Sequence, residues 1–157
     1  MPKIAETDRD IVRCFDTIAE LRPHLKRQDF LALVRQMQAD GYRIAFIEES
    51  GRVLAVAGYR IVTNLHMGRH LYVEDLVTSG AARSQGLGAQ MIRWLRRQAV
   101  AAGCAYLDLD SGTQRSGAHR FYFRHGFTIA SYHFSEILDQ HRQDVDKRDA
   151  TPAAPRT

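Results

Sequence analysis

One stretch near the middle of the chain joins two elements of different type: Tyr72-Val73-Glu74-Asp75-Leu76-Val77-Thr78-Ser79-Gly80-Ala81-Ala82-Arg83-Ser84-Gln85-Gly86-Leu87-Gly88. Its first part completes the apolar and β-branched run Leu71–Thr78, which predicts a strand. Its last glycines open Gly86–Ala102, where apolar residues recur at helical spacing and Gly103 follows as a stop. The sequence therefore predicts a strand, a glycine-rich loop and a helix in direct succession.

The loop of this unit has the features of an anion-binding site. Glycine lets the backbone come close to a ligand, and the first N–H groups of a helix have no intrahelical partner. These groups lie at the positive end of the helix dipole, and Arg83 adds a fixed positive charge. Neither a P-loop nor a G-x-G-x-x-G dinucleotide fingerprint is present. The alternative is a glycine-rich turn whose glycines serve only helix packing.

The elements on either side of this unit predict one domain of the α+β, or mixed α/β, class over residues 1–138. Strands are expected at Ile11–Phe15, Arg43–Glu48, Arg52–Thr63, Leu71–Thr78, Cys104–Asp110 and Phe127–Ile137. Helices are expected from a cap at Asp16 toward Leu25, and at Gln28–Asp40, Gly86–Ala102 and Gln114–His125. Turns at 49–51 and 64–69 would join three strands into an antiparallel meander. Residues 139–157 are charged and then rich in Pro and Ala, which predicts a disordered tail.

Composition limits the possible classes of function. Hydrophobic residues make up 45% and charged residues 25% of the 157 residues, as in globular domains. No run approaches the roughly 18 apolar residues of a membrane span, and the N-terminus shows no export signal, so we expect a cytoplasmic protein without membrane contact. Cys14 and Cys104 form no CxxC pair, and the histidines have no metal spacing, which predicts reduced thiols and no metal. The net charge of +4 suits an anionic ligand, but no nucleic-acid platform is present.

A second motif lies one strand and one turn downstream of the loop. Ala118, Phe121, Tyr122, Gly126 and Phe127 complete the pattern A-x-x-F-Y-x-x-x-G-F. Together with the first stretch, which matches E-D-L-V-V-x-P-x-x-R-G-x-G-I-G without a gap, it resembles the GCN5-related N-acetyltransferase (GNAT) superfamily. The resemblance is carried by motifs over 72–127 and by element order over 10–138.

The sequence departs from the family pattern at three places. Gly80 stands where Pro is usual, and Ser84 stands where Gly is usual. Ser84 adds a hydroxyl that could also face a phosphate, so binding need not be lost. Ser111-Gly112-Thr113 replaces an Asn that often leads the following helix, which puts one contact to pantetheine in doubt.

The resemblance implies a GNAT-like central sheet, mixed but mostly antiparallel and twisted, flanked by helices. It also implies that an acetyl group moves from acetyl-CoA to a primary amine by direct transfer in a ternary complex, without a metal. Pantetheine would pair with the strand backbone like an added strand. The residues that the resemblance implies for acetyl-CoA binding are Leu76, Val77, Thr78, Arg83, Ser84, Gln85, Gly86, Leu87, Gly88, Ser111, Ala118, Phe121 and Tyr122.

Two residues are candidates for the chemistry of transfer. The amine must lose a proton before it attacks, and the departing thiolate must gain one. The resemblance to polyamine-type acetyltransferases places the base at Glu74, with Asp75, expected on the opposite strand face, or a water chain as the alternatives. The family uses the tyrosine at Tyr122 as the acid, and a phenol stays protonated at neutral pH. The alternative for Tyr122 is a core aromatic, since Phe121 and Phe123 flank it.

Other interpretations stay open. A CoA-binding regulatory module of the same fold would turn over little, and a small nucleic-acid-binding domain would use the arginine surface and lose affinity steeply with salt. Arg115, Arg120 and Arg124 could reach a CoA phosphate or only solvate a helix face, and His119 could shuttle a proton or lie on the helix surface. The acceptor amine, small molecule or protein, is not readable from the sequence. Dimers are common in the family that the chain resembles, so a homodimer is one expected state.

Overall fold

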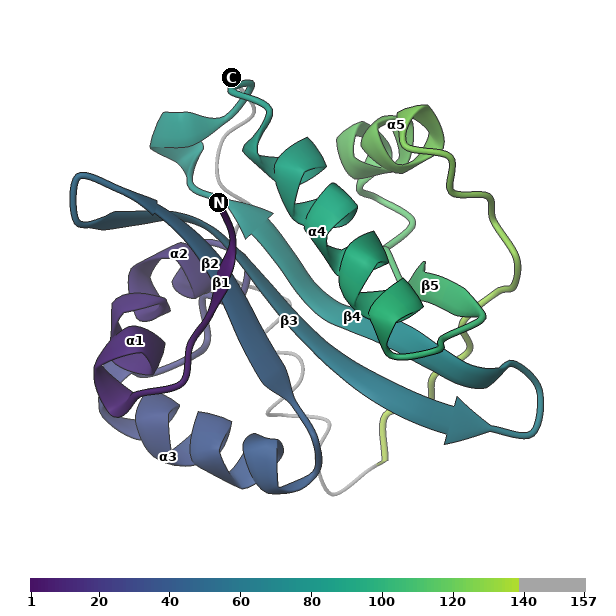
Figure 1. Ribbon diagram of the computed structural model, residues 1–157, viewed down its shortest axis with the longest axis horizontal. Coiled ribbons are helices and arrows are strands. Elements are labelled where there is room, and N and C mark those ends of the chain that lie inside the picture. Colours follow the sequence, from purple (N-terminus) through teal and green to yellow (C-terminus); the bar gives the residue numbers. More distant parts are fainter. Residues whose placement is uncertain (139–157) are drawn as a thin grey trace.

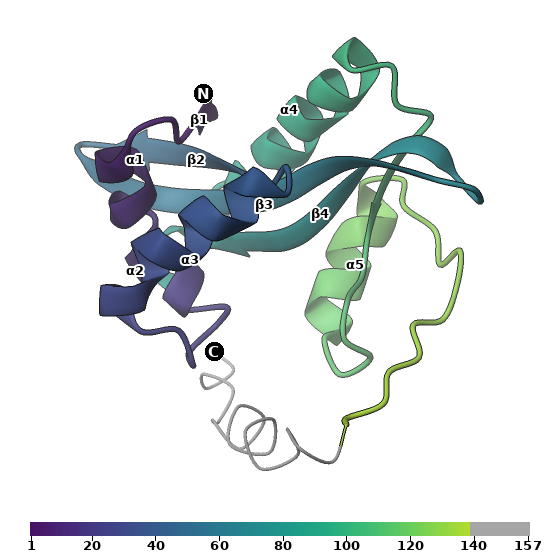
Figure 2. The ribbon, with the colours of Figure 1, turned by 90° about the horizontal axis from the view of Figure 1, so that it is seen from below.

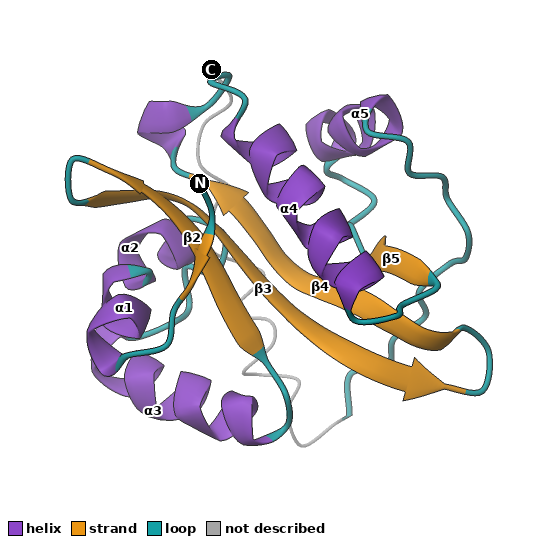
Figure 3. Ribbon diagram, in the orientation of Figure 1, coloured by secondary structure: helices purple, strands orange, loops and turns teal. Residues whose placement is uncertain are grey.

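The computed structural model describes residues 1–138, and the expected tail, 139–157, lies outside the described residues. Figures 1 and 3 show the arrangement of its helices and strands. In order, the elements are β1 (Lys3–Ile4), α1 (Asp8–Arg13), α2 (Phe15–Ala19), α3 (Arg27–Ala39), β2 (Arg43–Glu49), β3 (Arg52–Asn64), β4 (Gly68–Thr78), a 3₁₀ turn (Gly80–Ala82), α4 (Leu87–Ala101), β5 (Tyr106–Leu109) and α5 (Ser116–Arg124).

The strands form one twisted, mixed sheet in the order β1-β2-β3-β4-β5 (Figure 1). The pairs β1–β2, β2–β3 and β3–β4 are antiparallel, and only β4 and β5 run parallel within the described residues. A parallel pair needs a crossover, and α4 supplies it. The predicted fold class, α+β with a mostly antiparallel mixed sheet flanked by helices, is thereby confirmed.

The helices cover both faces of the sheet. Figure 2 shows α4 on one face and α1, α2 and α3 on the other. Alternate residues of each strand supply the two hydrophobic clusters, one beneath α4 and one beneath α1–α3. The α5 helix lies beyond β5, at the open end of the sheet (Figures 1 and 2). No helix among residues 1–138 is long and apolar enough to cross a membrane.

The predicted meander is present, with both of its turns. Ser50 and Gly51 each have a positive φ, 49° and 79°, which suits a tight hairpin turn between β2 and β3. At the second turn the side-chain oxygen of Asn64 accepts hydrogen bonds from the backbone N–H groups of His66 and Met67. Local turn chemistry therefore sets the register of the three long strands.

The first predicted strand, Ile11–Phe15, is wrong. Thr7 begins a helix there: its hydroxyl accepts from the Asp10 N–H at 3.1 Å, and the Asp10 carboxylate accepts from the Thr7 N–H at 3.3 Å. This capping box is a local signal that the apolar run obscured. Asp16 is not the cap of the next helix either, because α2 begins at Phe15 and ends at Ala19, before Pro23.

The last predicted strand, Phe127–Ile137, is also wrong, because this segment forms no strand in the described part of the chain. Its alternating large side chains would need a sheet face to bury them. Instead Ile129, Tyr132 and Phe134 are 70%, 82% and 90% exposed. Alternation predicted the conformation of a strand, but a strand also requires a partner, and none is formed with β5.

A β-bulge interrupts β4 where it passes β3. Asp75 pairs with Gly58 and Val73 pairs with Tyr59, so Glu74 is an extra residue on β4. Gly58 has no side chain for a specific reason: a Cβ there would lie 1.8 Å from the Tyr42 hydroxyl and 2.8 Å from an Asp75 oxygen. The hydrogen bond from Tyr42 to Asp75, 2.8 Å long, crosses the space above Gly58.

We predict that Gly58→Ala lowers the free energy of unfolding by about 2–4 kcal/mol, because the new methyl group must displace Tyr42 and break its hydrogen bond to Asp75. Urea denaturation measures the change. Gly117→Ala is the matched control, since a Cβ at Gly117 has only the Arg120 guanidinium nearby, at 4.0 Å, and helical alanine is favoured over glycine. Equal stability of Gly58→Ala and the wild type would contradict the packing described for Tyr42.

Candidate active site

The strands β4 and β5 separate at the middle of the molecule. Their pairing ends at Val73 and Leu109, whereas β4 continues to Thr78. Over Glu74–Thr78 the edge of β4 that faces β5 therefore has backbone groups without a strand partner. An open groove of about 880 Å³ runs from this edge, past the glycine-rich loop, to α5. An amide-rich chain can bind such an edge as an added strand.

The loop at the end of the groove presents backbone N–H groups. Gly86, with a φ of 78°, precedes α4 and has no side chain to cap the helix. Ser84 also has a positive φ, 64°. Glu20 holds the start of the loop: it accepts from the Gly80 N–H at 2.8 Å and from the Ser79 hydroxyl at 3.0 Å. The arrangement leaves the helix N-terminus open to an anion.

The groove brings together nearly all residues that the resemblance implied for acetyl-CoA binding. Its lining includes Leu76, Val77, Thr78, Arg83, Ser84, Gly86, Leu87, Gly88, Ala118, Phe121 and Tyr122. Gln85 and Ser111 do not line it. The Ser111 hydroxyl is buried and has no hydrogen-bond partner within the described residues. Gly88 acts in packing, because a Cβ there would lie 3.2 Å from the Phe121 ring, so its absence lets α5 approach α4.

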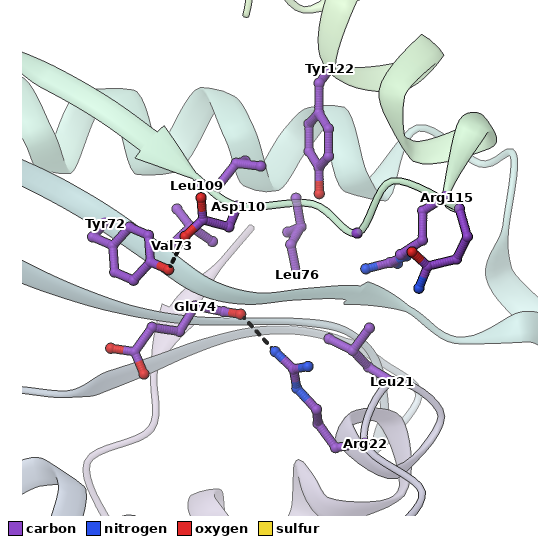
Figure 4. Close-up of a pocket in the computed structure, with 12 residues that line it drawn as sticks. Leu21, Arg22, Tyr72, Val73, Glu74, Leu76, Leu109, Asp110, Arg115 and Tyr122 are labelled. Carbon is purple, nitrogen blue, oxygen red and sulfur yellow. Dashed lines mark hydrogen bonds between the residues drawn. The ribbon is translucent and has the colours of Figure 1, made fainter. Parts of the chain in front are cut away.

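A smaller cavity of about 290 Å³ adjoins the groove at the point where the strands separate. Figure 4 shows its walls: β4 below, the end of β5 on one side, Arg115 on the other, and Tyr122 reaching in from α5. Arg22 enters from the segment after α2 and donates to the carbonyl of Glu74 at 3.0 Å. Tyr72 donates to Asp110 at 2.7 Å. The cavity is therefore lined by charges of both signs.

Tyr122 enters both the groove and the cavity. Its ring packs edge to face against Phe121 and Phe127, while Phe123 is 52% exposed. The helix thus does not bury the three consecutive aromatic residues alike. Burial raises the pKa of the Tyr122 hydroxyl above its ordinary value, and the positive charge of Arg115 opposes this shift. The hydroxyl is protonated at neutral pH and can donate a proton.

The bulge brings the two neighbouring acids to the same face of the sheet. Val73 and Leu76 pack against the cluster beneath α4. Between them, the extra residue interrupts the alternation, so that both Glu74 and Asp75 reach partners on the α1–α3 side. The expectation that Asp75 faces away from Glu74 is therefore wrong, because strand alternation holds only where the register is regular.

Both acids have protein partners. Glu74 accepts from the Arg60 guanidinium, and Arg60 in turn donates to the carbonyl of Asp40 at the end of α3. Asp75 accepts from Tyr42 at 2.8 Å and from the Arg22 Nε at 2.9 Å, one bond on each carboxylate oxygen. Each carboxylate oxygen of Asp75 thus has a partner within the protein. Burial, followed by the charge of Asp75, raises the pKa of Tyr42.

Comparison with known proteins bears on this geometry. The sequence pattern described as "Acetyltransferase (GNAT) family" matches residues 7–127. The chain belongs to this family. It is 34% identical over 122 residues to the uncharacterized N-acetyltransferase YhdJ of Bacillus subtilis, covering 76% of this chain and 86% of YhdJ. It is 29% identical over 98 residues to the aminoalkylphosphonate N-acetyltransferase of Salmonella typhimurium, covering 62% of each chain.

Solved structures show the same fold. The aminoglycoside N-acetyltransferase AAC(6')-Iy in complex with CoA superposes with a TM-score of 0.75 at 16% identity, over 88% of this chain and 95% of that one. The predicted resemblance to the GNAT superfamily is confirmed, and the family and its named relatives support acetyltransferase activity in general.

Some residues of this GNAT site had no signal in the sequence. Glu20 and Arg22 lie far from both motifs along the chain, and Asp110 lies between the motifs without belonging to either; only folding brings these residues to the groove or the cavity. The alternation Asp108-Leu109-Asp110 at the end of β5 was the one available hint, because alternate residues of an extended segment place two acids on one face. Among the other residues weighed, His119 bonds the Gly112 carbonyl at 2.9 Å, which ties the preceding loop to α5. Residues 1–138 contain no His, Cys, Asp and Glu cluster fit for a metal.

We predict that Gly86→Val prevents CoA binding, because a β-branched residue is strained at a φ of 78° and would fill the space that a pyrophosphate approaches. Arg83→Ala should weaken CoA binding less, by about ten- to a hundredfold, through loss of a charge-assisted hydrogen bond. Calorimetric titration with CoA, on variants whose melting curves are first recorded, measures both effects. Unchanged affinity in a folded Gly86→Val protein would refute the assignment of the loop.

Proposed function

We propose that this protein is an N-acetyltransferase that moves the acetyl group of acetyl-CoA directly to a primary amine in a ternary complex. One observation carries the proposal: the unpaired edge of β4 and the hydroxyl of Tyr122 border the same groove, which ends at an uncapped helix N-terminus. The edge suits pantetheine, the helix suits pyrophosphate, and the hydroxyl suits the leaving thiolate. The relatives are named for different acceptors, so their substrates do not transfer to this chain.

In this reaction the amine attacks the thioester carbonyl, the C–S bond breaks and coenzyme A leaves as the thiol. Tyr122 gives its proton to the departing sulfur; its raised pKa keeps the hydroxyl protonated at neutral pH, so that the proton is present when the C–S bond breaks. Backbone N–H groups near Leu76 and Val77, on the edge without a strand partner, polarise the carbonyl oxygen as fixed dipoles. The protein needs no covalent intermediate for these steps.

Glu74 is the proposed base and accepts the ammonium proton through water. Its carboxylate pairs with Arg60 and lies across β4 from Tyr122 in Figure 4. Because the carboxylate and the Tyr122 hydroxyl lie on different sides of the strand, we propose that water carries the proton from the amine to Glu74. Asp75 is the poorer candidate, because both of its oxygens are occupied by Tyr42 and Arg22. A water chain open to solvent is the second possibility for the proton's exit.

The direct test is release of thiol from acetyl-CoA over a panel of cationic, neutral and zwitterionic amines and lysine-containing peptides. We expect turnover with at least one amine, and a higher melting temperature with acetyl-CoA but not with NAD or ATP. A rise with acetyl-CoA and no turnover across the panel would favour the regulatory module of the same fold. Steeply salt-dependent binding to polynucleotides, without any response to acetyl-CoA, would favour the nucleic-acid alternative.

We predict that Tyr122→Phe lowers kcat by roughly ten- to a thousandfold with little change in acetyl-CoA affinity, because the ring stays and only the proton donor is lost. Steady-state kinetics and calorimetry separate the two quantities. The matched control is Tyr132→Phe, which removes the same atom from a side chain that is 82% exposed and borders neither the groove nor the cavity. Wild-type turnover in Tyr122→Phe would mean that Tyr122 is only a packing residue.

We predict that Glu74→Gln is slow at neutral pH with saturating amine and recovers as the pH rises toward the amine's own pKa. Rising pH then supplies the free amine that the carboxylate no longer produces. A pH–rate profile measures this, with Asp75→Asn as the matched control, which should lose stability without showing such recovery. An equal loss of rate at every pH would instead assign Glu74 a positioning role. No loss of rate at all would leave a water chain as the route by which the amine's proton leaves.

A further inference from the structure

We propose that the acceptor is a small amine that also carries an acidic group, with Arg115 binding the acidic group and Asp110 binding the ammonium. This inference rests on the transferase function proposed above and names its substrate class. It is drawn from the charges around the smaller cavity, where one cation and one anion are left without an opposite ionic partner of fixed charge within residues 1–138.

The size of the cavity suits a small acceptor. Its volume of about 290 Å³ is about a third of the 880 Å³ of the groove, and it lies at the lower end of the range of about 300–1,000 Å³ typical of small-molecule sites. Its walls come from the segment after α2, from β4, from the end of β5, and from α5 with the loop before it, so that several charged side chains converge on one small space. Such a site recognises its ligand chiefly by charge.

Arg115 supplies the positive end of the cavity. It lies immediately before α5, lines both the cavity and the groove, and makes no ion pair or hydrogen bond through its side chain to any described residue. The other nearby guanidinium groups are engaged: Arg22 with Asp75 and the Glu74 carbonyl, and Arg60 with Glu74. Of the two arginines that line the cavity, Arg115 is therefore the one whose guanidinium N–H groups are free to bind a carboxylate or a phosphate.

Asp110 supplies the negative end. One of its oxygens accepts from the Tyr72 hydroxyl at 2.7 Å, and His133 Nδ1 lies 3.4 Å away. A histidine carries a charge only when it is protonated, so Asp110 has no partner of permanent positive charge in the described part of the chain. Glu74 and Asp75, by contrast, are each bonded to an arginine. An ammonium group beside Asp110 would complete the charge pairing.

The two free charges lie on opposite sides of the reacting position. In Figure 4 the hydroxyl of Tyr122 points into the cavity between Asp110 and Arg115. A ligand that spans the cavity would place its amine near Asp110 and its acidic group near Arg115. A diamine of the same length would bring its second ammonium group toward Arg115, where like charges repel. The arrangement thus favours a zwitterion over a neutral amine or a diamine.

The experiment compares four amines of similar length as acceptors: β-alanine, phosphoethanolamine, propylamine and 1,3-diaminopropane. We expect kcat/KM for at least one acid-bearing amine to exceed that of the neutral amine and of the diamine by tenfold or more. The ratio of β-alanine to phosphoethanolamine distinguishes a carboxylate from a phosphate. Preference for propylamine or for the diamine would overturn the proposal while leaving the transferase function intact.

Arg115→Gln tests the residue. We expect it to reduce the preference for the acid-bearing amine by about ten- to a hundredfold, mainly through KM for the amine, with KM for acetyl-CoA little changed. Arg97→Gln removes the same charge from an exposed position on α4 that borders neither the cavity nor the groove, and should retain the preference. A loss confined to acetyl-CoA in Arg115→Gln would assign this arginine to the cofactor instead and contradict the proposal.

Binding in the presence of CoA separates the two proposals. CoA carries no acetyl group, so the melting temperature with CoA and each amine reports acceptor binding without turnover. A rise with the acid-bearing amine but no transfer from acetyl-CoA would support this substrate class as a ligand and refute the transferase function. If the two acid-bearing amines give no rise in melting temperature and no turnover, the inference is overturned.

Discussion

The β4 strand continues for five residues, Glu74–Thr78, after its pairing with β5 has ended. An unpaired strand edge is normally a liability, because its N–H and C=O groups need partners. This one is stable because β3 still pairs with the other edge, and because Leu76 and Val77 pack into the clusters on opposite faces. The groove, the access to Tyr122 and the position of the smaller cavity all follow from this separation.

The bulge at Glu74 couples that separation to the helices on the far face. By adding one residue it brings two carboxylates to the α1–α3 side, where Arg60 and Arg22 neutralise them. Half-buried carboxylates are costly unless each oxygen is bonded, and here the bonds reach the end of α3, the segment after α2 and the buried Tyr42. The same contacts that stabilise the bulge therefore orient the wall of the cavity that Arg22 forms.

Charge is distributed unevenly around the site as a result. On the α1–α3 side Glu74 and Asp75 each have an arginine, and at the loop Glu20 accepts from the Ser79 hydroxyl and the Gly80 N–H. Around the opening between the strands, Arg115 and Asp110 have no such ionic partner within residues 1–138. Glu74 and Asp75 are thus paired within the protein, and Arg115 and Asp110 are the charges around the smaller cavity that we assign to the ligand. For this reason we assign the paired acids to the support of the site, and Arg115 and Asp110 to the selection of the acceptor.

The sequence by itself determined the meander, the loop before α4 and the motif that ends at Phe127. These elements can be predicted from short stretches of sequence, because turn residues and the strand and helix periodicities depend only on residues close together in the chain. Tertiary structure alone decided the bulge at Glu74, the common face of Glu74 and Asp75, and the absence of a strand over 127–137. It also decided that Arg22 and Asp110 meet at one cavity. These features depend on which segments pair and pack in space, and local patterns carry no information about partners so distant in the chain.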